Sequence, residues 1–391
     1  MPSLQQIIRI GYNKIADTKP FPRFVRRAVE WIVMCRTAAL GGHVQACPEG
    51  HFERIQYNSC KHRFCPTCAY TSIERWLERQ KARILACEHY HVIFTLPGEL
   101  DRLWRANVRE MTELLFQAAR DTIFELLADA KYLGVEPGMI LARYTWGQTL
   151  VLHPHVHCLV TGGGLTNDGR WRAVRNGYLL PGRVVRDLFR GKFLAAARKS
   201  LERGKLRVPE GQRAQQILNL FNKLGRKKWN VSIRERYADG SGVLKYLGRY
   251  LRGAPISERR IVAWDEKKVR FRYKDNRAGK ESGRTEMREM ELPIEQFVER
   301  LLEHVPGPGH KLVRSYGLYA ASRLADLQRC RALLGQPRFE APEPADWQTC
   351  VERAGGNEAG LCPVCGAKLV VREVLTPLRD RPRKLPMRRA A

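Results

Sequence analysis

The spacing of apolar residues along the chain predicts several helices. Residues 1–46 are predicted to be helical, residues 71–87 form a basic amphipathic pattern, and residues 100–133 carry a long helical pattern. Residues 183–228 are basic and mainly helical in pattern. Shorter helices are predicted at Val243–Arg252, between glycines, and at Pro293–His304.

Alternating apolar and polar positions predict strands between these helices. The predicted strands are His91–Leu96, two strands within 139–162, Trp229–Glu235, and a hairpin of Ile261–Trp264 with Val269–Tyr273. The chain contains neither a GxGxxG motif nor a P-loop, and its strands and helices interleave. The pattern therefore favours an α+β fold with an antiparallel sheet over a doubly wound fold.

Composition points to a polyanionic partner. Among 391 residues, 69 Lys and Arg face 40 Asp and Glu, a net charge of +29 that is spread along most of the chain. A globular protein this basic usually binds nucleic acid. The sequence shows no apolar run long enough to span a membrane and no secretion signal at its N-terminus, so a cytoplasmic protein is expected.

The eleven cysteines are odd in number and unevenly clustered, which argues for metal sites in a reducing compartment rather than for disulfides. The main cluster is Cys47, His51, Cys60, Cys65 and Cys68. Four of these five are predicted to bind a structural zinc ion, with Cys47 and Cys60 preferred beside the Cys65–Cys68 knuckle and His51 the main competitor. Lys61 and Arg63 nearby suit phosphate contacts.

A second knuckle, Cys362 and Cys365, is a candidate for another zinc site. Cys330, Cys350 and His310 are the partners considered for it, all at irregular spacings. The remaining cysteines, Cys35, Cys87 and Cys158, are predicted to be core residues. Three domains follow: 1–88 with the helices and zinc site, 89–325, and a basic region 326–391 that ends in a disordered tail from residue 376.

The strand that holds His155 and His157 is the main candidate for catalysis. Side chains alternate along a strand, so both imidazoles lie on one face and could bind one divalent ion that keeps positions open for a phosphate oxygen. Gln148 is the candidate for a further oxygen ligand. Three histidines that stand by chance on a half-exposed strand, His153 with His155 and His157, are the alternative.

Tyr246 and Tyr250 are one helical turn apart in the helix predicted at 243–252, so both phenols share a face. A tyrosine that attacks a phosphodiester keeps the bond energy in a phosphotyrosine, so rejoining needs no ATP. Lys245, Arg249 and Arg252 could favour the phenolate or bind the DNA backbone. Two tyrosines packed in an ordinary amphipathic helix are the alternative.

Together these motifs resemble the rolling-circle transposases of the insertion sequence 91 (IS91) family, in the HUH endonuclease superfamily. The resemblance covers roughly residues 20–325. It rests on the Tyr57–Cys68 segment, Phe94–Pro97, Gln148–His157, Tyr246–Tyr250, Val269–Tyr273 and Val313–Gly317. It implies a zinc-binding N-terminal domain before an HUH-type antiparallel sheet with packed helices.

Carried over by motif, the resemblance implies that His155 and His157 hold Mg²⁺ or Mn²⁺, with Tyr246 as the first nucleophile and Tyr250 as the second. Glu49 stands where many relatives have a cysteine, which leaves the fourth zinc ligand open. The expected partners are single-stranded DNA at element ends and the bacterial replication machinery, with no membrane and no small-molecule substrate. The alternatives are a rolling-circle replication initiator and a non-catalytic zinc-dependent DNA-binding protein.

Overall fold

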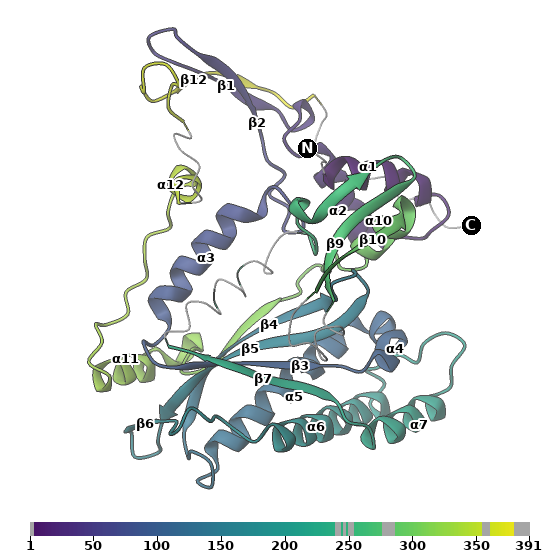
Figure 1. Cartoon of the computed structure of the whole chain (residues 1–391), viewed down its shortest axis with the longest axis vertical. Coiled ribbons are helices and arrows are strands. Elements are labelled where there is room, and N and C mark those ends of the chain that lie inside the picture. The colour runs from purple at the N-terminus through teal and green to yellow at the C-terminus, as the bar shows by residue number, and fades with distance from the viewer. Residues whose placement is uncertain are drawn as a thin grey trace. The chain divides into compact units, whose positions relative to one another are not determined.

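The chain folds into two compact units, each built from separate stretches of sequence (Figure 1). The computed structural model describes residues 4–238, 244, 248, 254–275, 286–353 and 360–378. Unit 1 contains Met1–Arg75, Arg252–Pro308 and Glu343–Ala391, and unit 2 contains Trp76–Leu251 and Gly309–Pro342. The sequence predicted three consecutive domains instead, because apolar periodicity does not reveal which distant segments complete one sheet.

Unit 2 is built on a six-stranded antiparallel sheet, as the strand pattern predicted. The strand order is β11-β4-β5-β3-β7, and β6 pairs with β5 beside this path. The strands are β3 (His89–Thr95), β4 (Glu136–Trp146), β5 (Leu152–Leu165), β6 (Trp171–Ala173), β7 (Asn230–Tyr237) and β11 (Val313–Gly317). The predicted strands at 91–96 and 229–235 and the pair within 139–162 are confirmed, while β11 was not predicted.

Helices α5 and α6 cover one face of this sheet (Figure 1). The described part of unit 2 contains the helices α4 (Asp101–Ala106), α5 (Val108–Ala128), α6 (Gly182–Glu202), α7 (Ala214–Gly225) and α11 (Leu324–Leu333), with the short helices η2 (Gly98–Leu100) and η4 (Ala321–Arg323). Tyr90, Val92 and Phe94 of β3 point into the core beneath them, and the ring centroids of Phe94 and Phe189 lie 4.7 Å apart. The odd-numbered residues of β3 therefore face the other side of the sheet.

The helix predicted over 100–133 is broken at Asn107, which has non-helical backbone angles between α4 and α5. Its side chain donates to the carbonyl of Leu103 (3.0 Å) and accepts from the backbone N–H of Arg207 (2.7 Å). These bonds compensate for the helical bonds lost at the break. Apolar periodicity continues across the break, so the sequence pattern did not reveal it.

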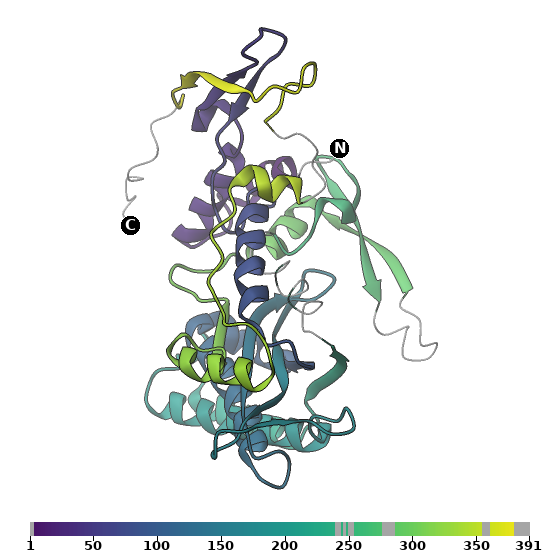
Figure 2. The ribbon, with the colours of Figure 1, turned by 90° about the vertical axis from the view of Figure 1, so that its left-hand side faces the viewer.

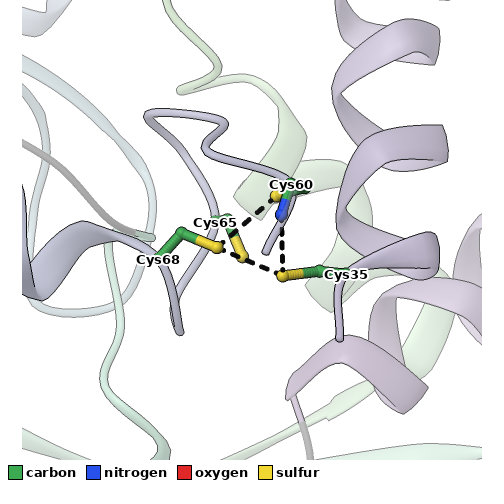
Figure 3. Close-up of side chains that lie close together, drawn as sticks. All are labelled: Cys35, Cys60, Cys65 and Cys68. Carbon is green, nitrogen blue, oxygen red and sulfur yellow. Dashed lines mark hydrogen bonds between the residues drawn. The ribbon is translucent and has the colours of Figure 1, made fainter. Parts of the chain in front are cut away.

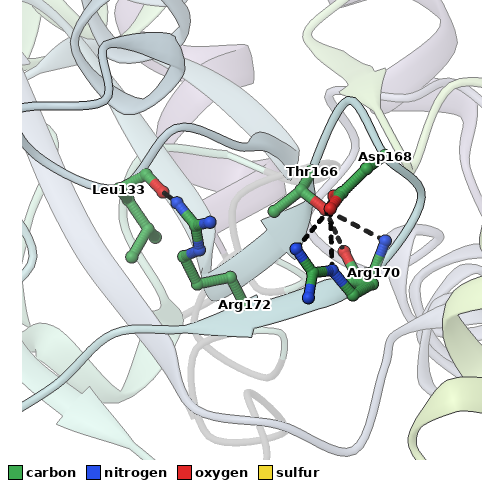
Figure 4. Close-up of polar contacts among 5 residues, drawn as sticks. All are labelled: Leu133, Thr166, Asp168, Arg170 and Arg172. Carbon is green, nitrogen blue, oxygen red and sulfur yellow. Dashed lines mark hydrogen bonds and ion pairs between the residues drawn. The ribbon is translucent and has the colours of Figure 1, made fainter.

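The end of β5 farthest from its histidines is fixed by the β5–β6 hairpin (Figure 4). Within the turn, Asp168 accepts from Thr166 and from Nε of Arg170 (2.7 Å). Arg172 on β6 donates to the carbonyl of Leu133 (2.9 Å), which ties the hairpin to the segment after α5. The hairpin thereby holds this end of the long strand β5 in place.

One part of unit 1 packs three helices beside a small sheet. Helices α1 (Leu4–Ile15), α2 (Arg23–Met34) and α10 (Ile294–Leu302) pack near the sheet β10-β9-β8, formed by β8 (Ile261–Trp264), β9 (Lys268–Asp275) and β10 (Glu286–Pro293), with η3 (Glu258–Arg260) before β8. Gly11 of α1 allows close contact with α10, because a Cβ there would lie 2.6 Å from Val298 Cγ2. The predicted hairpin and the helix at 293–304 are confirmed, and β10 is added.

The other part of unit 1 is a second antiparallel sheet, β12-β1-β2, which joins segments from both ends of the sequence. Strands β1 (Gly42–Ala46) and β2 (Glu53–Tyr57) form a hairpin, and β12 (Val370–Leu375) pairs along β1 (Figures 1 and 2). The prediction of helix through residue 46 is therefore wrong: α2 ends at Met34, and η1 (Ala38–Leu40) leads into β1.

Two helices remain. Helix α3 (Ala69–Arg83) begins in unit 1 and ends in unit 2, in place of the helix predicted at 71–87, and α12 (Trp347–Glu352) belongs to unit 1. Across the described ranges, none of the helices combines the length and apolarity needed to cross a bilayer.

Candidate functional site

Four cysteines of unit 1, Cys35, Cys60, Cys65 and Cys68, converge on one point (Figure 3). All their sulfur atoms lie within 4.8 Å of one another. Sγ of Cys68 lies 3.1 Å from Sγ of Cys35 and 3.7 Å from Sγ of Cys60. Four soft sulfur donors this close suit a closed tetrahedral zinc site.

Each cysteine of this cluster is positioned by local structure. Cys35 follows the last residue of α2, and the Gln5 side chain donates to the carbonyls of Ile32 (2.8 Å) and Cys35 (2.9 Å), which fixes that helix end. The backbone N–H of Cys65 donates to the carbonyl of His62 (3.1 Å), which forms the turn before the knuckle. Hydrogen bonding with Cys60 lowers the pKa of the Cys35 thiol to about 6, so Cys35 favours the thiolate form that a metal requires.

The structure corrects the predicted grouping of ligands. Cys35, predicted to be a core residue, takes the place in this cluster that the sequence prediction gave to Cys47 or His51. Cys35 lies 25 residues from Cys60 along the chain. That separation hid it, because knuckle spacing reveals only ligands that are close in sequence.

Cys47 and His51 belong instead to a second cluster with Cys362 and Cys365, whose four ligand atoms also lie within 4.8 Å of one another. The partners considered from sequence for the second knuckle were Cys330, Cys350 and His310, and none of these is in the cluster. The pairing of β12 with β1 brings the distant knuckle here, and no local spacing could reveal that.

In unit 2, His155 and His157 lie on one face of β5, as the alternation predicted. Their ring centroids are 4.9 Å apart. His157 is opposite Ile93 of β3, and His155 is opposite Thr95. The Tyr144 ring on β4 lies against both imidazoles, with centroid distances of 5.3 Å to His155 and 4.3 Å to His157.

His155 is prepared to act as a neutral ligand. Its Nδ1 donates to the backbone carbonyl of His153 (2.6 Å), so the remaining lone pair is on Nε2. Burial lowers the pKa of His155 to about 3, and burial also lowers the pKa of His153. A neutral imidazole with its second nitrogen held by a carbonyl is the usual form of a metal-binding histidine.

The structure adds a residue that the sequence prediction missed, His91 on β3. Its Nε2 lies 2.7 Å from Nδ1 of His157, and the two rings are stacked with centroids 5.0 Å apart. Both side chains are buried. The alternation of β3 was a usable signal, because Tyr90, Val92 and Phe94 occupy the core face and leave His91 on the other.

Gln148 lies in the turn between β4 and β5, half-buried, and its predicted role as an oxygen ligand stays a prediction. Among the described residues, three or more His, Cys, Asp or Glu ligand atoms lie within 4.8 Å of one another in two places, and both are in unit 1: the cluster around Cys35 and a second cluster around Cys47. The two histidines of β5 therefore form a pair rather than a preformed three-ligand site.

The predicted nucleophiles Tyr246 and Tyr250 lie outside the described residues, as do Lys245, Arg249 and Arg252 and the tail from residue 379. Of the helix predicted at 243–252, the structure describes Leu244 and Gly248, and both are helical. Gly248 packs closely on α3, since a Cβ there would lie 2.8 Å from Leu77 Cδ2.

The two cationic residues proposed near the first knuckle differ in environment. Lys61 is exposed, in a left-handed conformation with φ 52°. Arg63 donates to the carbonyls of Pro306 (3.0 Å) and Gly307 (2.5 Å), so its guanidinium holds a loop of unit 1. The phosphate contacts predicted for both residues remain predictions.

Comparison with known proteins identifies the family. Residues 7–96 match the transposase zinc-binding domain of the IS91 type, and residues 138–326 match the Y2 transposase family, described as "Putative transposase". Solved structures of the conjugative relaxase TrwC with DNA align at TM-scores of 0.23, with 14% and 13% identity. They cover 41% of this chain and 68% and 71% of theirs, so the family assignment rests on sequence relatives.

Two relatives extend over most of this chain. The "Transposase for insertion sequence element IS801" of Pseudomonas savastanoi pv. phaseolicola is 27% identical over 89% of this chain and 83% of its own length. The "Putative transposase y4qJ" of Sinorhizobium fredii is 37% identical over 87% of this chain and 86% of its own length. With both domain models matched and this identity sustained over nearly the whole length, the chain belongs to the IS91 family of Y2 transposases, which carry an N-terminal zinc-binding domain.

Proposed function

We propose that this transposase cleaves and rejoins single-stranded DNA at insertion-sequence ends through a tyrosine nucleophile and a divalent ion bound by the His155–His157 pair. The observation that carries the proposal is the pair itself: two imidazoles on one face of β5, one neutral with Nε2 available and the other bonded to His91. In each ring Nδ1 has a hydrogen-bond partner, which is the arrangement that metal-binding histidines usually have.

The chemistry proceeds by exchange of one phosphodiester bond for another. The Tyr246 phenolate oxygen attacks the scissile phosphorus, and the bond from phosphorus to the 3′ oxygen breaks. The product is a 5′-phosphotyrosine, and the leaving 3′ oxygen takes up a proton. Attack of a 3′ hydroxyl on that phosphotyrosine reverses the step and joins DNA, and Tyr250 serves for the second end or the target.

His155 and His157 would hold Mg²⁺ or Mn²⁺, with Gln148 as a further oxygen donor. A divalent ion there stabilises the negative charge that develops on the phosphate. The amide oxygen of Gln148 suits either ion, whereas imidazole is a softer donor than Mg²⁺ prefers, so this donor set fits Mn²⁺ better than Mg²⁺. For the imidazole of His157 to bind through Nε2, its Nδ1 must donate to Nε2 of His91, which assigns His91 as a positioning residue.

The net charge of +29 supports a DNA partner, since neutralising phosphates releases counterions and gives salt-dependent affinity. Lys61, Arg63, Lys245, Arg249 and Arg252 are the proposed phosphate contacts. The first cysteine cluster would hold the structural zinc of the N-terminal domain. We expect the protein to act in the bacterial cytoplasm at the nucleoid, with the host replication machinery separating strands.

The test is a denaturing gel of the full chain with labelled single-stranded DNA from the element end, in Mn²⁺ or in EDTA. Wild type should give an SDS-resistant protein–DNA band only with metal. His155→Ala should lower its rate of formation by about 10²–10³, the value of one preorganised electrostatic contact. Tyr246→Phe should abolish the band, and Tyr250→Phe, at the next tyrosine in the sequence, is its matched control.

The outcomes distinguish the roles of the two tyrosines and separate a cleaving enzyme from a DNA-binding protein. A band that persists in Tyr246→Phe and disappears in Tyr250→Phe would exchange the two roles. Tight, salt-dependent binding with no band for any end sequence would instead identify a DNA-binding protein without cleavage activity.

A further inference from the structure

The second cluster of unit 1, formed by Cys47, His51, Cys362 and Cys365, lies partly outside the matched zinc-binding domain. Cys47 and His51 are within residues 7–96, the matched zinc-binding domain. Cys362 and Cys365 follow both matched segments, the second of which ends at residue 326. We propose that these four side chains bind a second structural zinc ion, which attaches the C-terminal strand β12 to the N-terminal hairpin β1–β2.

The ligand atoms already have the separations that one ion needs. Sγ of Cys47 lies 3.5 Å from Sγ of Cys365 and 3.9 Å from Nδ1 of His51. A tetrahedral zinc ion with bonds of about 2.3 Å to sulfur holds its sulfurs about 3.8 Å apart. Binding replaces three thiol protons, which pass to solvent, and uses the neutral imidazole of His51.

The two loops that carry these ligands, residues 47–52 and residues 362–367, have the same backbone hydrogen bond, which argues against a chance encounter. Each begins with Cys-Pro. In each, the N–H of the first cysteine donates to the carbonyl five residues later, from Cys47 to Phe52 and from Cys362 to Ala367, both at 2.8 Å. Both loops are thus closed by the same backbone hydrogen bond, while the second ligand is His51 in one loop and Cys365 in the other.

A glycine in the left-handed region turns each loop: Gly50 with φ 76° and Gly366 with φ 72°. A residue with a Cβ would be strained at either position. The backbone N–H of each glycine also donates to the carbonyl of the first cysteine in its loop, from Gly50 to Cys47 at 3.0 Å and from Gly366 to Cys362 at 2.9 Å.

The sheet that carries these loops has little else to hold it together. Its local apolar cluster consists of Cys47, Cys362 and Leu369, with Phe52 and Ala367 beside it. Val370, Val371 and Val374 of β12 are 50%, 56% and 74% exposed, so that strand buries few side chains. A sheet with so small an apolar cluster needs a further cross-link for stability, and a metal ion supplies one.

The strand arrangement places both loops at the same end of the sheet. Ala46, just before the loop that carries Cys47 and His51, pairs with Val370, and Gly42 at the other end of β1 pairs with Leu375. Figures 1 and 2 show the two loops side by side at that end in both views. The ion would therefore join segments separated by 318 residues at the point where β1 and β12 meet.

The proposal does not depend on the cleavage chemistry, and its test needs no DNA. Zinc in the purified full chain is measured by atomic emission. Wild type should carry two ions per chain and Cys362→Ser/Cys365→Ser one. Cys350→Ser, from the same C-terminal segment but outside both clusters, is the control and should carry two.

His51 provides a second variant that separates ligation from folding, because this residue is exposed and its replacement leaves the core intact. His51→Ala should lose one zinc ion, and His51→Cys should retain it. In Co²⁺-substituted protein, His51→Cys should also strengthen the thiolate-to-metal absorption band. A wild type with one zinc ion, or unchanged zinc content in both His51→Ala and the double serine variant, would overturn the proposal.

Proteolysis provides a readout of the strand itself. Trypsin cleavage after Arg372, within β12, should be about 100-fold slower when free zinc is 100 times its dissociation constant than in the metal-free protein. In the double serine variant, zinc should give no protection there. Equal cleavage of wild type with and without zinc would contradict attachment of β12 by the ion.

Discussion

Replacing His91 tests whether a residue outside the predicted motif positions the metal ligand His157. His91→Phe keeps an aromatic ring on β3 but removes the acceptor that lies 2.7 Å from Nδ1 of His157. Loss of such an outer partner usually weakens metal affinity by about 10–100-fold. This corresponds to about 1.4–2.8 kcal/mol of binding free energy. We therefore expect the Mn²⁺ dissociation constant to rise by that factor, measured by calorimetric titration, with the cleavage rate recovering at high Mn²⁺.

Two further variants make this prediction specific. Gln places an amide oxygen near the position of the imidazole Nε2, so His91→Gln should recover most of the affinity if His157 donates the hydrogen bond. His89→Phe is the matched control on the same strand, because His89 is buried but pairs with the Tyr319 hydroxyl (2.7 Å). It should lower stability and leave Mn²⁺ affinity unchanged. Equal affinities for wild type and His91→Phe, or equal losses in His91→Phe and His89→Phe, would refute the positioning role.

Three other predictions follow from the described geometry. Cys35→Ser should lower zinc content by one ion per chain, while Cys158→Ser, in the core of unit 2, should leave it unchanged. Unchanged zinc content in Cys35→Ser would restore the sequence-based grouping. Phe94→Ala should lower the free energy of unfolding by about 3–5 kcal/mol in urea titrations, because the side chain is fully buried against Phe189, whereas exposed Met287→Ala should change it little. In metal-free protein, the free energy of unfolding should fall as the pH drops from 6.5 toward 3. The pKa of His155 is about 3 in the folded chain, so over this range only the unfolded chain takes up the proton. This residue should therefore contribute a slope of up to about 1.4 kcal/mol per pH unit. His155→Gln should flatten that slope, and an unchanged pH profile would show that this imidazole is not held neutral.

Local patterns predicted unit 2 well. The alternation around His155 and His157 correctly gave a strand with both imidazoles on one face, and the period-3.6 patterns gave α5 and α6. These features depend on neighbours within a few residues, which sequence periodicity reports directly. Asn107 shows the limit, because its helix break depends on bonds to Arg207, 100 residues away.

Long-range pairing was not predictable from one sequence. Cys35 looked like a core residue because it follows an amphipathic helix, and its neighbours in the cluster come from a later loop. Val370–Leu375 has the composition of a strand, but nothing local shows that its partner is Gly42–Ala46. The same reason explains why His91 was missed: its role depends on the pairing of β3 with β5, which orients it toward His157.

The discontinuous construction of unit 1 also sets an order of events during synthesis. Cys35 to Cys68 emerge from the ribosome early and can fold around their ion while the chain is growing, but Cys47 must wait for Cys365, 318 residues later. At about 5–20 residues per second, this delay is roughly 15–60 s. Throughout that interval the β1–β2 hairpin has an unpaired edge, open to pairing with another strand. The nascent chain therefore completes unit 1 only after β12 has been made, and a chain that stops earlier keeps the open edge of β1.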